Sequence, residues 1–193
     1  MAIARVYKQT NQPKLFDKVI QSLQDGLGNL SWMNHIFGRS ERLVKDVDGH
    51  RVYSPNIYKG DDDYILLTPD NTELGNYCFF VMEEPQVIRD SEGIQARIRS
   101  PFSLIVWVDM RTVEQHSDTR ATEAVKEDVL QAIGKAWIKE GNVTLQRIYE
   151  RAENVFQGFT LDEVDNQFLM SPYWGMRVQG EMTVQEDCEP MTR

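Results

Sequence analysis

The chain has 193 residues, of which 41% are hydrophobic and 26% charged, a composition typical of a globular protein with one domain-sized core. Its formal net charge is −9, which disfavours tight binding to duplex nucleic acid, because such binding depends on neutralising phosphates with Lys and Arg. Two cysteines provide neither a disulfide framework nor a metal motif. The first residues lack the apolar core of a signal peptide and no segment is apolar for long enough to cross a bilayer, so we expect synthesis in a reducing cytoplasm and no membrane contact.

The N-terminal segment predicts an arm followed by helices. Residues 1–12 are polar and predict a loose arm. Pro13 opens a predicted helix, since the first helical turn makes no use of the N–H that proline lacks. Apolar residues then recur at helical spacing until Gly26, where we expect the helix to end. Residues 29–37 predict a second short helix.

The middle of the chain predicts a run of strands. Asp48 and Gly49 supply a two-residue turn, so the residues around them predict a β-hairpin. A polar loop is expected over residues 55–63, ending in Asp61, Asp62 and Asp63. The strands are expected at residues 42–53 (the hairpin), 64–67, 77–82, 86–89 with 94–98 (a second hairpin), and 103–110.

The C-terminal part predicts a long helix and two more strands. Residues 119–137 show an apolar stripe at helical spacing, with Thr119 as its N-cap. A strand is expected at 143–149, and Thr160 begins a one-turn helix with a capping box. The last strand alternates apolar and polar residues, so we expect one buried and one wet face. Its apolar members are Met176, Val178, Met182 and Val184, its polar members include Arg177 and Gln179, and Gly175 and Gly180 predict a bulge or a close backbone approach.

Together these elements predict the α+β class: a mainly antiparallel β-sheet packed with one long helix and N-terminal helices. We expect one domain over residues 13–188 and a short tail over 189–193. Cys78 lies in an apolar strand and is expected to be a buried thiol. Trp107 and Trp137 are expected in the core.

No catalytic, cofactor or metal site is predicted. The histidines, His35, His50 and His116, are not spaced as metal ligands, and no Gly-rich phosphate loop is present. The three adjacent aspartates lack the alternating ligands of a calcium loop, so a solvated acidic loop is the favoured interpretation. Asp109 ends an apolar strand and is expected to pair with Arg111.

The order of these elements resembles that of the tail-terminator, tail-completion and head–tail joining proteins of tailed bacteriophages. The resemblance covers residues 13 to 188. Its pieces are the first helix (15–23), the early hairpin (42–53), the acidic loop (61–63), the central strand ending in Trp-Val-Asp (104–109), the long helix (121–137) and the last strand (173–184).

The resemblance implies a structural virion protein that forms a homo-oligomeric ring, contacts other neck or tail proteins and lines a passage for DNA. An acidic lumen would repel phosphates, so DNA would pass without specific binding. In that ring we expect Asp61, Asp62 and Asp63 to face the channel or an axial neighbour, and Tyr173 and Trp174 to lie at an interface. One alternative is a non-enzymatic protein-binding module of a bacterial or mobile-element protein. Another is a hydrolase with a site around Asp109 and His116.

Overall fold

The computed structural model describes residues 4–91, 95–113, 120–139 and 141–187, in which it places ten strands and three α-helices. The strands are β1 (Arg5–Tyr7), β2 (His35–Arg39), β3 (Glu41–Val47), β4 (His50–Gly60), β5 (Asp63–Leu66), β6 (Tyr77–Met82), β7 (Val87–Ser91), β8 (Gln95–Asp109), β9 (Gly141–Tyr149) and β10 (Tyr173–Asp187). The helices are α1 (Phe16–Leu27), α2 (Thr122–Lys135) and α3 (Ala152–Val155).

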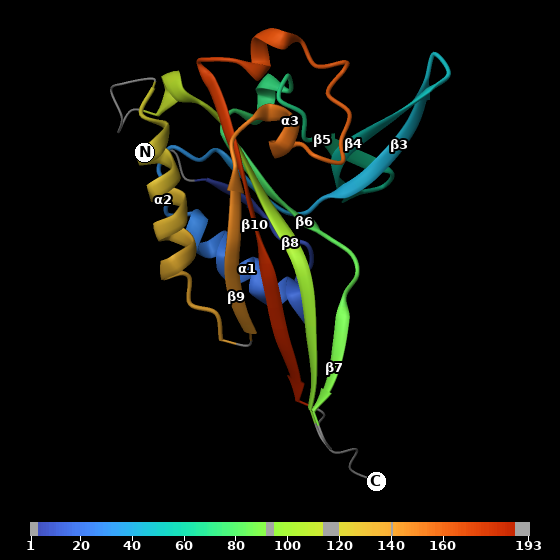
Figure 1. Cartoon of the computed structure of the whole chain (residues 1–193), viewed down its shortest axis with the longest axis vertical. Helices are drawn as coiled ribbons and strands as arrows, with labels where there is room; N and C mark the ends of the chain where they lie inside the picture. Colours follow the sequence, from blue (N-terminus) through green and yellow to red (C-terminus); the bar gives the residue numbers. More distant parts are fainter. Residues whose placement is uncertain (1–3, 92–94, 114–119, 140, 188–193) are drawn as a thin grey trace.

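Two sheets organise these strands. A seven-stranded sheet has the order β1-β2-β6-β8-β10-β9, with β7 paired to β8 beside it, and a separate sheet has the order β3-β4-β5. Helices α1 and α2 lie on one side of the large sheet, and the β3–β4 hairpin lies on the other (Figure 1). The large sheet therefore buries apolar side chains on both of its faces.

The central strand β8 shows why its sequence is continuously apolar. Leu104, Val106 and Val108 point to the helices, whereas Ile105 and Trp107 point to the cluster under α3 and the small sheet. All five are buried. A strand covered on both faces has no solvent-exposed side, so its sequence is a continuous apolar run and does not alternate apolar and polar residues.

The expected fold class is wrong in two respects. The sheet is mixed, because β1 pairs parallel with β2 and β2 pairs parallel with β6. The described residues also hold one N-terminal helix, α1, and strands dominate the architecture. Where a second helix was predicted, Ile36 and Phe37 are consecutive residues of β2 that enter the two opposite apolar clusters. A strand places neighbouring side chains on opposite faces, whereas a helix does not.

Several other expectations need correction. The polar loop predicted over 55–63 is mostly strand, because β4 runs to Gly60 and buries residues 54–57. Residues Arg5–Tyr7, within the expected arm, form β1. Thr160 does not begin a helix: its hydroxyl accepts a hydrogen bond from the Tyr53 N–H at 3.0 Å and ties this segment to β4. Trp137 is 78% exposed beyond the end of α2.

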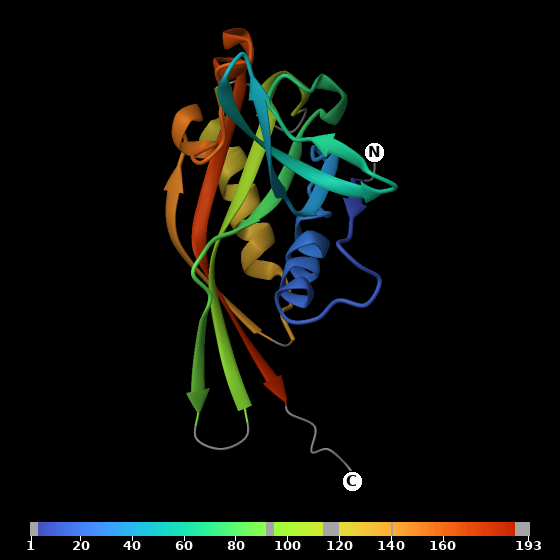
Figure 2. The same ribbon diagram turned by 90° about the vertical axis from the view of Figure 1, so that its right-hand side faces the viewer.

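The two strands expected at 94–98 and 103–110 are one continuous strand, β8. Most other elements are confirmed, with shifted ends. Helix α1, the two hairpins, β6, β9 and β10 lie where the sequence places them, and Thr119 is outside the described residues. Strands β8 and β10 have 15 residues each and pair along their whole length. Their far ends, with β7, extend beyond both helices (Figure 1). Figure 2 shows the face of the sheet opposite the helices, with β9 at one border and β1 at the other.

Candidate functional site

The outer edge of the large sheet is formed by β9. This nine-residue strand pairs with β10 on one side, and no described strand pairs with its other side. Leu145 and Ile148 are 37% and 38% exposed. The pairing with β10 shifts register between Gln179 and Gly180, which is the bulge predicted at Gly180. Peptide groups along such an edge are free to pair with a further strand.

A second unpaired edge belongs to β3. The strand pairs with β4 alone among the described strands, and most of its side chains are exposed on both faces. Val44 is 53% exposed and Val47 37%. The hairpin stands away from the large sheet on the side opposite α2 (Figure 1). Its expected turn is confirmed, because Asp48 and Gly49 both have positive φ, at 49° and 82°.

The three aspartates form the turn between β4 and β5. Asp61 and Asp62 have φ of 52° and 60°, a conformation that Asp tolerates better than most residues. Asp63 is ion-paired with Lys59, whose hydrogen bond lowers the pKa of this carboxyl group. Within the described residues no three acidic, His or Cys side chains are grouped so as to hold a metal ion.

Tyr173 and Trp174 begin β10 and are both partly buried. The Tyr173 hydroxyl accepts a hydrogen bond from Arg111 Nη2 at 3.0 Å, and its ring lies 5.2 Å from that of Phe168. Trp174 packs against the helix-side core. Both aromatic residues therefore already have contacts within the subunit.

Asp109 pairs with Arg111, as expected. Its carboxylate accepts hydrogen bonds from Arg111 Nε at 2.9 Å and Nη2 at 2.7 Å. These bonds hold the pKa of Asp109 below its ordinary value. His116, its expected partner in a hydrolase, lies outside the described residues. A carboxylate kept ionised and bound to a guanidinium is a poor general base.

A buried polar network joins β10 to its surroundings. Arg177 is 4% exposed, although the alternating pattern places it on the wet face. Its Nε donates to Ser103 Oγ at 2.7 Å, its Nη1 donates to the Gln157 carbonyl at 2.8 Å, and its Nη2 pairs with Glu83. Ser103 in turn donates to Glu83 at 2.5 Å. The Ser103 hydroxyl donates to Glu83 and accepts from Arg177, and the network ties β10 to β8 and to the segment after α3.

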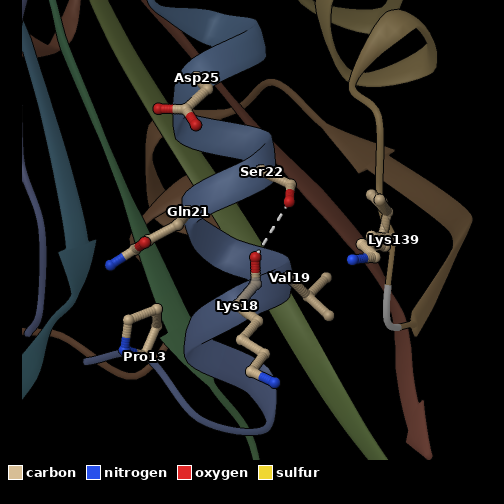
Figure 3. Close-up of a pocket in the computed structure, with 8 residues that line it drawn as sticks. Pro13, Lys18, Val19, Gln21, Ser22, Asp25 and Lys139 are labelled. Atoms are coloured by element: carbon tan, nitrogen blue, oxygen red, sulfur yellow. Dashed lines mark hydrogen bonds between the residues drawn. The ribbon is translucent and has the colours of Figure 1, made fainter. Parts of the chain in front are cut away.

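A shallow cavity of about 200 Å³ lies between α1 and the segment after α2. Figure 3 shows Lys139 facing α1 across it, while Ser22 donates a hydrogen bond to the carbonyl of Lys18. The lining residues are Pro13, Lys18, Val19, Gln21, Ser22, Asp25, Ile138 and Lys139. This set contains no pairing of a nucleophile with a base.

The surface features that the described residues present are the exposed edges of β3 and β9 and the acidic turn at residues 61–63. In the part of the chain that the structure describes, no helix is both long and apolar enough to cross a membrane. Compared with known proteins, the chain matches no family model and no curated protein.

Proposed function

We propose that the chain is a non-enzymatic structural protein of a tailed-phage virion, located at the head–tail junction. It assembles as a homo-oligomeric ring that joins or caps coaxial rings of other neck or tail proteins and lines the passage for DNA. The observation that carries this proposal is the nine-residue unpaired edge of β9, with Leu145 and Ile148 exposed beside it. Such an edge suits association through strand pairing better than it suits catalysis.

Ring assembly needs two different surfaces on each subunit. A heterologous contact, in which one surface meets another, generates a closed ring when the rotation between neighbours closes. Among the described strands, β3 has a second unpaired edge, in a hairpin that stands away from the large sheet. Two distinct edges on one subunit support a head-to-tail arrangement.

The proposal assigns a position in the ring to the acidic turn. Asp61 and Asp62 project at the tip between β4 and β5, and neither has an ion-pair partner among the described residues. In the ring this turn faces the DNA passage or an axial neighbour. With the net charge of −9, an acidic lining repels DNA phosphates and lets the genome pass without specific binding. Tyr173 and Trp174 are proposed contacts to a neighbour.

The test is the mass of the purified protein in solution. Light scattering is measured on the protein alone and after mixing with particles from its source, and both samples are imaged by electron microscopy. The expected result is a single high-order oligomer, or incorporation into a neck-like assembly. A persistent monomer that joins nothing would contradict the proposal.

A second candidate function is a non-enzymatic protein-binding module. The exposed Trp137 favours it, because tryptophan is enriched at the centres of interfaces and this side chain is 78% exposed. Under this alternative the protein stays monomeric or dimeric, and Trp137→Ala abolishes capture of its partner. If the protein forms rings and Trp137→Ala leaves them intact, the module function loses its support.

A further inference from the structure

The unpaired strand edges differ greatly in length. Among the described strands, the free edges of β1, β5 and β7 have three, four and five residues. The edges of β3 and β9 have seven and nine. These two are the edges long enough to form several backbone hydrogen bonds with a partner strand of matching length.

The side chains on both strands suit burial. Val44 and Val47 of β3 are 53% and 37% exposed, and Leu145 and Ile148 of β9 are 37% and 38% exposed. Strand β3 is exposed on both faces at the border of the three-stranded sheet, and cross-strand contacts with an added strand would stabilise it. Strand addition would bury these four apolar side chains and pair the free peptide groups of both edges.

The charges on the two strands are compatible with pairing. Arg147 is the one charged residue of β9. On β3, the guanidinium of Arg42 is held 3.9 Å from the ring centre of Tyr53, within its own hairpin. Antiparallel pairing with Val44 opposite Thr144 places Glu41 of β3 opposite Arg147 and Lys45 opposite the apolar Val143. Because β9 has no acidic residue, no two acidic side chains are brought together.

The two edges belong to different sheets of the same subunit. The β3–β4 hairpin leans away from the large sheet in Figure 1, and β9 lies at the border of that sheet in Figure 2. Strand β3 does not pair with β9 of its own subunit, so a contact between these two edges would join two copies of the chain. Because β3 and β9 are different surfaces, each copy can use both at once, which makes a heterologous contact.

We propose that β3 of one copy pairs with β9 of the next, so that the three-stranded sheet of each subunit extends the seven-stranded sheet of its neighbour. This inference rests on the ring assembly proposed above and names the contact that builds it. The occupant of the β9 edge is thus a second copy of this chain.

The first experiment replaces one exposed apolar residue on each edge by lysine, which removes apolar surface that strand addition would bury and adds a charge at its place. Val44→Lys and Leu145→Lys are each expected to weaken self-assembly by about tenfold or more. Ile88→Lys is the matched control, because Ile88 is 70% exposed on β7, outside the proposed contact. Thermal melting followed by circular dichroism should be similar for all three variants, since each position is exposed in the subunit.

The second experiment tests the pairing itself by disulfide formation. Val44→Cys is combined in turn with Thr144→Cys, Leu145→Cys or Gln146→Cys, in a Cys188→Ser background in which Cys78 is buried. Disulfides require closely spaced Cα atoms, so one of the three pairs should give a ladder of covalent multimers on oxidation. Val44→Cys with Gln131→Cys on α2 should give no ladder.

The outcomes separate this inference from the proposed function. Rings that form without a ladder from any of the three pairs would overturn the β3–β9 contact and leave the ring assembly standing. Absence of any assembly, alone or with particles, would overturn both. Assembly that requires particles and is blocked by Leu145→Lys but not by Val44→Lys would show that another protein's strand occupies β9, which also overturns the inference.

Discussion

Two glycines let β10 lie close to its neighbours. A Cβ atom at Gly175 would be 2.1 Å from a ring carbon of Trp107, and one at Gly180 would be 2.4 Å from the Thr144 carbonyl oxygen. Both distances are far below van der Waals contact, and neither the buried ring nor the backbone can move away easily. At these positions glycine is required by space and not by backbone conformation.

Gly175→Ala is therefore expected to lower the free energy of unfolding by about 2 kcal/mol, because the added methyl group overpacks the core. The matched change is Gly134→Ala in α2, where nothing lies within 4 Å of the added Cβ. That variant should be more stable by about 0.5–1 kcal/mol, since alanine favours a helix over glycine. Urea unfolding of both variants measures the difference. Equal stabilities would contradict the close approach at Trp107.

At the scale of elements, Arg177 connects three parts of the fold that are distant in sequence. It lies on β10, reaches Ser103 on β8, pairs with Glu83 just after β6, and binds the carbonyl of Gln157 just after α3. Removing Arg177 takes away the hydrogen-bond donors of the Gln157 carbonyl and of Ser103, and leaves the partly buried Glu83 carboxylate without its cation, which costs more than the bonds themselves contribute.

Arg177→Ala should therefore lower the free energy of unfolding by about 3 kcal/mol. The amides of residues 152–160 should also exchange faster with solvent, because the tie to Gln157 is lost. Arg51→Ala, at an exposed position on β4, is the control and should change stability by less than about 0.5 kcal/mol. Hydrogen exchange that is unchanged around α3 would show that this helix is held by its apolar contacts alone.

The sequence predicts best those elements whose apolar residues recur with a clear helical or strand period. Helix α1, the Asp48-Gly49 hairpin and the inward residues of β10 depend on local spacing or turn chemistry, which the sequence carries directly. Residues 29–37 fit helical spacing as well as strand pairing, and only the two-sided sheet decides between them. The burial of Arg177 depends on Ser103, Glu83 and Gln157, which contact it through the fold and not through the sequence.

The same distinction applies to the surface features: those that depend on local sequence are predicted, and those that depend on the fold are not. The sequence indicates the acidic residues 61–63, but not that Asp61 and Asp62 form a turn between two strands. The free edges of β3 and β9 are invisible in the sequence, because an edge is defined by the strand that is missing beside it. The exposure of Trp137 results from α2 ending at Lys135, short of the predicted end.

At the scale of the whole molecule, Cys78 reports on the integrity of the core. It lies on β6, inside the seven-stranded sheet, and is fully buried. Burial raises the pKa of its thiol well above the ordinary value, so the reactive thiolate is scarce at neutral pH. Access to this thiol requires opening of the sheet.

In the Cys188→Ser variant, Cys78 should not react with a thiol reagent at pH 8 in the folded protein. Its reaction should begin only as urea unfolds the chain, with the same midpoint as the loss of circular dichroism. Fast labelling without denaturant would mean that β6 opens locally and that the core is less cooperative than its packing indicates.

The place of β10 in the sheet has a consequence for biosynthesis. It lies between β8 and β9, both of which precede it in the chain. As a nascent polypeptide leaves the ribosome, β8 and β9 have no strand between them until residues 173–187 emerge. Until then the face of the sheet against which the apolar residues of α1 and α2 pack is incomplete. Many contacts of the native state thus wait for a late segment, which is the topology that slows folding. Until that segment arrives, the emerging chain offers its β8 edge to other nascent chains, and a molecular chaperone has its greatest effect at that stage.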